Sequence, residues 1–182
     1  PNPFRYLVAK LISNKRARIA KEIYHLLGGK SPILKITDRQ AEALEKELSF
    51  DNAASYKVFV IMRYWHPMTK AVVKKIKEYQ PEETIMLPLY PQFSTTTTAS
   101  SFKEFKKEIE KQSVNTKLRS ICCYPDNNQF ILSHSRLIKK TIQKVVFSGY
   151  KNYRLLFSAH GLPQAIINNG DPYVFKIQLS TK

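Results

Sequence analysis

The chain has 182 residues, and 43% of them are hydrophobic, which is enough to bury the core of one ordinary domain and argues against disorder. The formal net charge of +16 predicts an anionic partner: nucleic acid, anionic lipid, or a small molecule rich in carboxylates or phosphates. The apolar runs are too short to span a bilayer. Adjacent Cys122 and Cys123 point to opposite faces of a strand, so they cannot form an ordinary disulfide, and a reducing compartment fits best.

Helical patterns recur along the chain. Apolar residues at helical spacing predict one helix over 4–12 and a second over 16–27, which Gly28-Gly29 would end. The run Thr37–Gln40 resembles a capping box that opens a helix to about Ser49. Three later helices are expected, one starting at His66-Pro67, one around 102–109 and one over 132–147.

Between the helices lie short, nearly continuous apolar runs that predict four strands: Val58–Tyr64, Ile85–Leu89, Leu118–Tyr124 and Arg154–Phe157. Such runs alternating with helices are typical of a parallel sheet covered on both faces, so the expected fold class is α/β and doubly wound. The polar stretch 112–117 is the candidate boundary between two such units.

Residues with chemical capacity follow each predicted strand. Because the carboxyl ends of parallel strands share one edge, these residues are expected to line one site. They are aromatic rings, hydroxyls, one arginine and histidines, which suit a large flat ligand with peripheral anions. No glycine-rich phosphate loop, GxSxG, CxxC or HExxH is present, so phosphoryl transfer, the common serine hydrolases and a preformed zinc site are not indicated.

The most informative segment is YRLLFSAHGLP, residues 153–163, which brings His160 to the end of an apolar run. An imidazole there can accept a proton or contact a metal near neutral pH, although a purely structural role fits the pattern too. Other positions also stay open. Tyr90 can be a core aromatic, Thr95–Thr98 a solvated turn or helix cap, and His66 a structural residue at a helix start.

Five motifs together resemble the ferrochelatase family, whose members insert ferrous iron into a porphyrin. In chain order they are GGKSPI (28–33), MRYWHP (62–67), LYPQFSTTTTASS (89–101), FSAHGLP (157–163) and GDPY (170–173). The resemblance implies Rossmann-like parallel sheets flanked by helices in a two-domain architecture. The first half would be residues 1–113, and 114–182 would begin an incomplete second half that carries the catalytic histidine.

The resemblance also implies an activity and a site. The expected reaction is insertion of Fe²⁺ into protoporphyrin IX to make protohaem, the last step of haem biosynthesis, by a lyase that retains no cofactor and uses iron as its substrate. His160 would be the catalytic and metal-site residue. The porphyrin-binding residues would be Arg16, Tyr24, Ser31, Arg63, Tyr64, Tyr90, Ser94 and Tyr173. Arg16 and Tyr24 fit one stripe of a helix, because Arg16, Ala20 and Tyr24 are spaced four apart.

The resemblance places the protein in the cytoplasm, with peripheral contact to the inner membrane through an apolar lip of Phe4, Leu7, Val8, Leu11 and Ile12. The pattern of this segment fits a core-facing helix equally well. Compared with the family, the chain is expected to be a fragment lacking an N-terminal strand and most of the second half, including the acidic partner of His160. The alternatives are an inactive porphyrin- or haem-binding fragment and a basic nucleic-acid-binding module, although no nucleic acid is expected as a partner.

Overall fold

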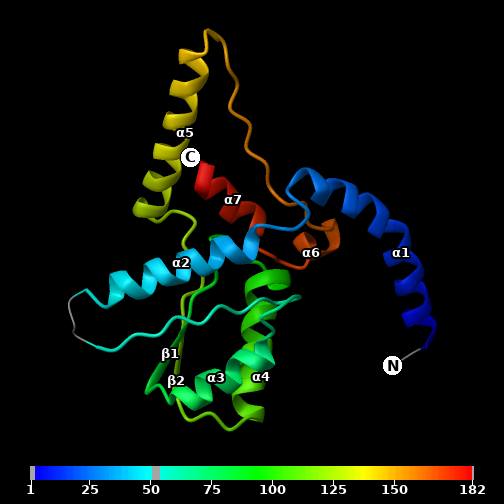
Figure 1. Ribbon diagram of the computed structural model, residues 1–182, viewed down its shortest axis with the longest axis vertical. Coiled ribbons are helices and arrows are strands. Elements are labelled where there is room, and N and C mark those ends of the chain that lie inside the picture. Colours follow the sequence, from blue (N-terminus) through cyan, green and yellow to red (C-terminus); the bar gives the residue numbers. More distant parts are fainter. Residues whose placement is uncertain (1–2, 51–53, 182) are drawn as a thin grey trace. The chain divides into compact units, whose positions relative to one another are not determined.

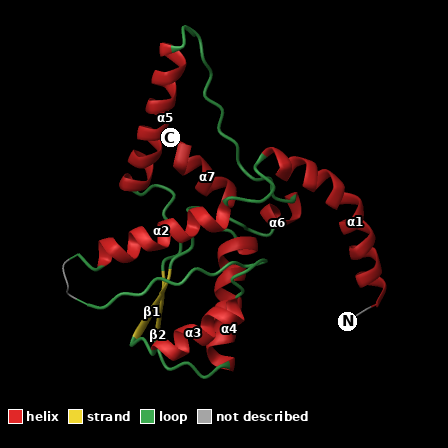
Figure 2. Cartoon of the chain, in the orientation of Figure 1, coloured by secondary structure: helices red, strands yellow, loops and turns green. Residues whose placement is uncertain are grey.

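The computed structural model describes residues 3–50 and 54–181 (Figure 1). The chain forms two compact units, Pro1–Ile61 and Met62–Lys182. Helices dominate both units, and the described residues contain one small parallel sheet, which lies in the second unit (Figure 2). The α/β class is therefore confirmed. The domain boundary expected between residues 113 and 114 stays a prediction. It was expected to separate two sheets, and the described residues contain one.

The first unit is built from two long helices, α1 (Pro3–Leu26) and α2 (Ile33–Leu48). The two helices expected at 4–12 and 16–27 are one continuous helix, because no breaker interrupts residues 13–15. Gly28 and Gly29 end it as predicted. Both have φ near +85°, which glycine adopts without steric cost, and the Gly29 amide bonds to the Tyr24 carbonyl at 2.7 Å.

The expected capping box at Thr37 is wrong, since α2 begins four residues earlier at Ile33. The helix starts at the Ser31-Pro32 pair. The Ser31 hydroxyl oxygen accepts a hydrogen bond from the Ile33 amide at 3.3 Å, and Pro32 occupies the cap position. A proline needs no amide partner there, so the helix can begin at once and Thr37 lies within it.

Glu45 of α2 holds the chain that follows this helix. Its carboxylate accepts hydrogen bonds from the Val58 amide at 2.8 Å and from the Lys57 ammonium at 2.9 Å. Both hydrogen bonds lower the pKa of Glu45 below its usual value, and the bond from Val58 has the larger effect. No described residue of the first unit is fully buried, so these polar links act without an apolar core around them.

The second unit begins with α3 (Thr69–Tyr79), and its sheet consists of β1 (Glu83–Met86) and β2 (Lys117–Ser120). The two strands pair in parallel from Glu83 opposite Lys117 to Met86 opposite Ser120. A five-residue π-helix (Thr95–Ala99) runs directly into α4 (Ser100–Lys111), and together they form the crossover from β1 to β2. Parallel strands require such a crossover, because a tight hairpin cannot connect them.

The apolar core of the described residues lies in α3, β1 and α4, where α3 packs on α4. It comprises Val72, Val73, Ile76, Met86, Phe105 and Ile109. Residues 72, 73 and 76 of α3, and 105 and 109 of α4, recur at three- and four-residue spacing. Each helix therefore buries one stripe, as the helical pattern predicted for 102–109.

Three further helices follow β2, namely α5 (Asn128–Phe147), α6 (Gln164–Asn168) and α7 (Tyr173–Thr181). The predicted helix over 132–147 is confirmed and begins four residues earlier. Its start is fixed by Asn127, whose side-chain oxygen accepts from the Gln129 and Phe130 amides at 3.0 and 3.1 Å. This is an asparagine N-cap, which satisfies two otherwise unpaired amides.

Two of the four predicted strands overlap the strands of the sheet, although β1 and β2 begin and end earlier than Ile85–Leu89 and Leu118–Tyr124, and the other two predicted strands do not form. Residues 58–61 form no strand, and Met62 makes only an isolated bridge to Met68. Residues 154–157 are extended and exposed, with Leu156 80% and Phe157 62% accessible. A strand needs a neighbouring edge to take its backbone hydrogen bonds, and neither run finds one within the described residues.

The core predicts a sharp contrast between two valines. Val73→Ala removes two methyl groups from a fully buried position, so it should lower the free energy of unfolding by about 2 kcal/mol. Val146→Ala on α5, where the side chain is 52% exposed, should cost less than about 0.5 kcal/mol. Urea titration followed by circular dichroism measures both, and equal losses would contradict the assigned core.

Candidate functional site

The site is built at the carboxyl ends of β1 and β2. Tyr124, after β2, fixes the loop that follows β1, residues 87–94, which we call the β1 loop. The Tyr124 hydroxyl donates to the Pro88 carbonyl at 2.8 Å, and the Tyr124 amide donates to the Pro91 carbonyl at 2.8 Å. Burial raises the pKa of Tyr124, which keeps this hydroxyl protonated as a donor. The two strand-end loops are therefore joined as the sequence predicted for a parallel sheet.

The last helix, α7, is also hydrogen-bonded to the β1 loop. The Gln92 side-chain amide donates to the Ser180 hydroxyl oxygen at 2.7 Å. Ser180 in turn donates to the Pro125 carbonyl at 2.8 Å. One serine near the end of the described chain thus bridges the loops that follow β1 and β2.

A buried carboxylate makes the densest set of hydrogen bonds in this region. Asp171 is 6% exposed. Its Oδ2 atom accepts from the Ser94 hydroxyl at 2.9 Å, the Thr95 amide at 2.7 Å and the Thr95 hydroxyl at 2.6 Å. Its Oδ1 atom accepts from the Tyr173 amide at 3.0 Å. We call Asp171 with Ser94, Thr95 and Tyr173 the Asp171 clamp, because it joins segments more than 70 residues apart in sequence.

The electrostatics of the clamp favour an ionised carboxylate. Burial alone would raise the pKa of Asp171, but the hydrogen bonds from Thr95, Tyr173 and Ser94 outweigh it and hold the pKa below its usual value. The carboxylate therefore carries its charge at neutral pH and acts only as an acceptor.

Arg63 forms a second polar cluster. Its Nε donates to the Ser100 hydroxyl oxygen at 3.0 Å, and its guanidinium pairs with the Glu104 carboxylate, both on α4. The guanidinium carbon also lies 4.6 Å from the centre of the Tyr64 ring, in cation–π contact. The predicted pair Arg63 and Tyr64 is thus brought together, with the arginine charge balanced by Glu104.

His160 makes no hydrogen bond to either cluster. It lies in the extended segment 150–163, is exposed, and makes no hydrogen bond to another described residue. The expectation of a buried strand delivering it is wrong for the reason given above. The exposed imidazole of His160 is open to solvent and to ligands.

The remaining predicted residues take several positions. Arg16 and Tyr24 are exposed on one stripe of α1, and Ser31 is exposed just before α2. These three belong to the first unit. In the second unit Tyr90 is 45% exposed on the β1 loop, so it is not the core aromatic that the sequence also allowed. Tyr173 is half-buried at the start of α7, and the Asp171 clamp connects it to Ser94.

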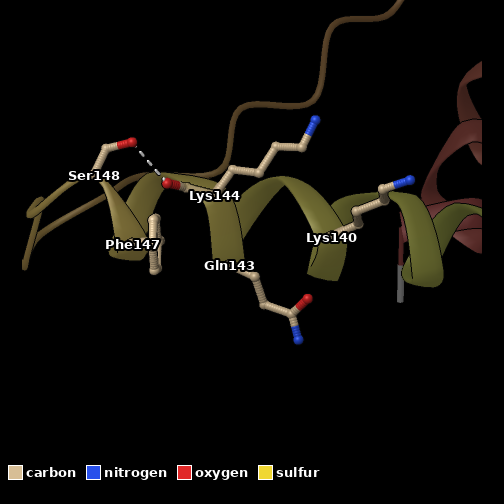
Figure 3. Close-up of a pocket in the computed structure, with 5 residues that line it drawn as sticks. All are labelled: Lys140, Gln143, Lys144, Phe147 and Ser148. Carbon is tan, nitrogen blue, oxygen red and sulfur yellow. Dashed lines mark hydrogen bonds between the residues drawn. The ribbon is translucent and has the colours of Figure 1, made fainter.

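Two hollows on the surface of the described residues differ in the chemistry of their lining. One of about 590 Å³ runs along α5 alone and is lined by Lys140, Gln143, Lys144, Phe147 and Ser148 (Figure 3). A single helix supplies every wall, and Phe147 is 95% exposed, so nothing there encloses a ligand. The other, of about 420 Å³, lies just beyond β1 and β2 and is lined by Leu87, Ile121, Tyr124, Asn127 and Phe130.

The second hollow occupies the place where open α/β sheets bind ligands, outside the carboxyl ends of parallel strands. Aliphatic and aromatic side chains form most of its lining, which suits a flat apolar ligand. Within residues 3–50 and 54–181, no group of three or more His, Cys, Asp or Glu side chains is arranged to hold a metal ion.

Comparison with known proteins gives the family. The family model described as ferrochelatase matches residues 1–182. The chain belongs to the ferrochelatase family. The resemblance inferred from the five motifs is thereby confirmed, and its coverage extends over the whole sequence.

Curated ferrochelatases match at similar levels. That of Pelagibacter ubique strain HTCC1062 is 46% identical over 183 residues, covering 100% of this chain and 52% of the relative. That of Rickettsia bellii strain OSU 85-389 is 47% identical over 182 residues, covering 100% and 49%. That of Wolbachia sp. subsp. Drosophila simulans strain wRi is 45% identical, covering 100% and 57%. The chain spans about half the length of the curated relatives it matches.

Sequence reasoning missed the role of Asp171. It assigned Tyr173 from the GDPY motif but did not predict that Asp171, two residues earlier, holds the loop that carries Ser94 and Thr95. A signal was present, since an aspartate directly before a proline and a helix often accepts a backbone hydrogen bond two residues on. The partners Ser94 and Thr95 carried no such signal, because they are distant in sequence.

The lowered pKa of Asp171 gives a pH prediction. The ionised carboxylate stabilises the folded chain above about pH 4, the ordinary aspartate pKa, and this contribution is lost as pH falls through the lower folded pKa. Asp171→Asn should reduce the free energy of unfolding at pH 7 by about 1–3 kcal/mol and flatten its fall below pH 4.

Urea unfolding from pH 7 to pH 3 tests this, with Asp38→Asn as the matched control, because Asp38 is exposed on α2. That control should follow the wild type at every pH. An Asp171→Asn profile parallel to the wild type would show that the clamp carries no ionised carboxylate.

Proposed function

We propose that this chain acts in ferrochelatase chemistry, the insertion of Fe²⁺ into protoporphyrin IX to make protohaem. The observation that carries the proposal is family membership over residues 1–182, with 46% and 47% identity to the Pelagibacter and Rickettsia ferrochelatases. Iron is the substrate in this reaction, and no resident cofactor is proposed.

The proposed roles of the site residues follow from their chemistry. The porphyrin would be bound by Arg16, Tyr24, Ser31, Arg63, Tyr64, Tyr90 and Tyr173. Ser94, which the motif also suggested, is too deeply buried for direct contact. Arg16 can hold a propionate through two parallel hydrogen bonds, and exposed tyrosine rings can pack on the macrocycle. Arg63 keeps donors beyond those used by Ser100 and Glu104, since a guanidinium has five N–H groups.

Metallation requires the removal of two pyrrole protons and of water from the incoming Fe²⁺. A neutral imidazole can serve in either step, because its free ring nitrogen is both a base and a metal ligand. The exposure of His160 supports this role, since nothing in the described residues occupies its ring nitrogens. A weak site with one histidine also suits an ion that must be released into the product.

We also propose peripheral contact with the inner membrane from the cytoplasmic side. Leu7, Val8, Leu11 and Ile12 lie on one stripe of α1 and are all exposed, which supports a lip rather than a core-facing helix. The side chain of Phe4 lies outside the described residues. Exposed apolar and basic residues on one helix favour an anionic lipid surface. None of the described helices is both long and apolar enough to cross a bilayer.

The first experiment tests His160 by measuring metallation of protoporphyrin IX by Fe²⁺. His160→Ala should leave the circular dichroism spectrum unchanged and reduce the rate about 10²–10⁴-fold, as the loss of a catalytic acid–base group does. His25→Ala, an exposed histidine on α1, should keep the wild-type rate. Near-normal turnover by His160→Ala would refute its role, and a wild-type chain that binds the porphyrin without metallating it would refute insertion.

The second experiment asks whether Arg16 binds a propionate or only adds charge. Arg16→Lys keeps the charge but loses the planar fork, so the dissociation constant for protoporphyrin IX should rise about fivefold. Lys21→Ala, which removes a charge from the same helix, should change it less than twofold. Fluorescence titration measures both. Equal effects would favour diffuse electrostatics over a specific contact.

A further inference from the structure

Ser94 belongs to the YPQFS motif, yet its environment leaves it no means of contacting a ligand. The residue is 1% exposed. Its single hydroxyl proton is donated to Asp171, which accepts only. Its oxygen accepts from the Thr96 amide at 3.2 Å and lies 2.8 Å from the Thr96 hydroxyl. The hydrogen-bonding capacity of Ser94 is therefore filled by the protein itself.

Asp171 accounts for this arrangement. Its two carboxylate oxygens take the Ser94 and Thr95 donors, where the π-helix begins, and the amide of Tyr173, where α7 begins. Hydrogen bonds to a buried charge are stronger than those between neutral groups, and losing their common acceptor would leave several donors unpaired.

The β1 loop and α7 are also fastened at a second point. Gln92 bonds to Ser180, eight residues into α7, while the Asp171 clamp holds the beginning of that helix. The Asp171 clamp at the start of α7 and the Gln92–Ser180 hydrogen bond near its end together fix the orientation of the helix relative to the β1 loop. A single hydrogen bond would not do so. Tyr173 begins the helix that these hydrogen bonds hold, and Tyr90 lies two residues before Gln92 on the loop.

We propose that Asp171 is a positioning residue for the porphyrin site: it holds the Ser94–Thr95 start of the π-helix against Tyr173, so that Ser94 acts by anchoring the loop and not by touching the ligand. This inference rests on the proposed function, and it names how one motif of that site works. Asp171 itself contacts neither the porphyrin nor the iron.

The decisive test compares two substitutions of Thr95. One removes the hydroxyl group that bonds to Asp171, and the other keeps it. Thr95→Val removes the hydroxyl that donates to Asp171 and keeps the side-chain shape, so the dissociation constant for protoporphyrin IX should rise about fivefold. Thr95→Ser keeps the hydroxyl and should restore binding to within twofold of the wild type. Equal weakening by both variants would overturn the proposal.

The second arm uses the carboxylate. Asp171→Asn should weaken protoporphyrin IX binding about tenfold at 15 °C, where circular dichroism must show the variant to be folded. The control Asp38→Asn should change it less than twofold. In the Asp171→Asn background, Thr95→Val should cause no further loss, since the acceptor is already altered. Additive losses would show that the two residues act separately and would overturn the proposal.

Amide hydrogen exchange separates this inference from the proposed function. In Asp171→Asn, exchange should accelerate at Thr95 and Tyr173, whose amides bond to the carboxylate, and stay unchanged at Val73 in the core. Unchanged exchange at Thr95 would overturn the clamp whatever the chain binds. If exchange becomes faster in Asp171→Asn but the wild-type chain binds no porphyrin, the clamp exists. The proposed function, and with it the role of the clamp in porphyrin binding, would then be refuted.

Discussion

The parallel pairing of β1 with β2 is the constraint on which the rest of the second unit depends. Parallel strands need a crossover, and α4 supplies it while burying Phe105 and Ile109 against α3. Both strands end at the same edge, so the loops that follow them meet there. Tyr124 can then bond to the β1 loop, and the polar clusters form next to a fixed sheet edge.

The sequence predicted the parts of the fold that side-chain pattern alone decides. An apolar stripe located α4, because burying one face of a helix leaves a periodic trace. The helix expected to start at His66-Pro67 is present, but that start is wrong, since α3 begins at Thr69. The strands were harder to predict, because an apolar run indicates only that a segment can be buried and not that it pairs with another strand. Residues 117–120 find a partner strand and residues 154–157 do not, although the second run is the more apolar. Pairing is a long-range property that a local pattern does not record.

The candidate site divides in the same way. His160, Arg63 and Tyr64 could be singled out because their side-chain chemistry is distinctive and their motifs are specific to the family. The bonds that organise the site could not, since Asp171 meets Ser94 across 77 residues and Arg63 meets Ser100 across 37. A serine in a binding motif suggests ligand contact, and only its burial and filled hydrogen bonds reveal an anchor.

The π-helix at Thr95–Ala99 sets the rotational phase of α4. A π-turn takes up one residue more than an α-turn, and α4 continues from it without a break. Converting that turn to α-helix would rotate α4 by about 100°, the angle of one residue. Such a rotation would carry Glu104 away from Arg63 and Phe105 out of the core. The run of four threonines thus works as a spacer whose length keeps the charged and apolar faces of the crossover helix in register with their partners.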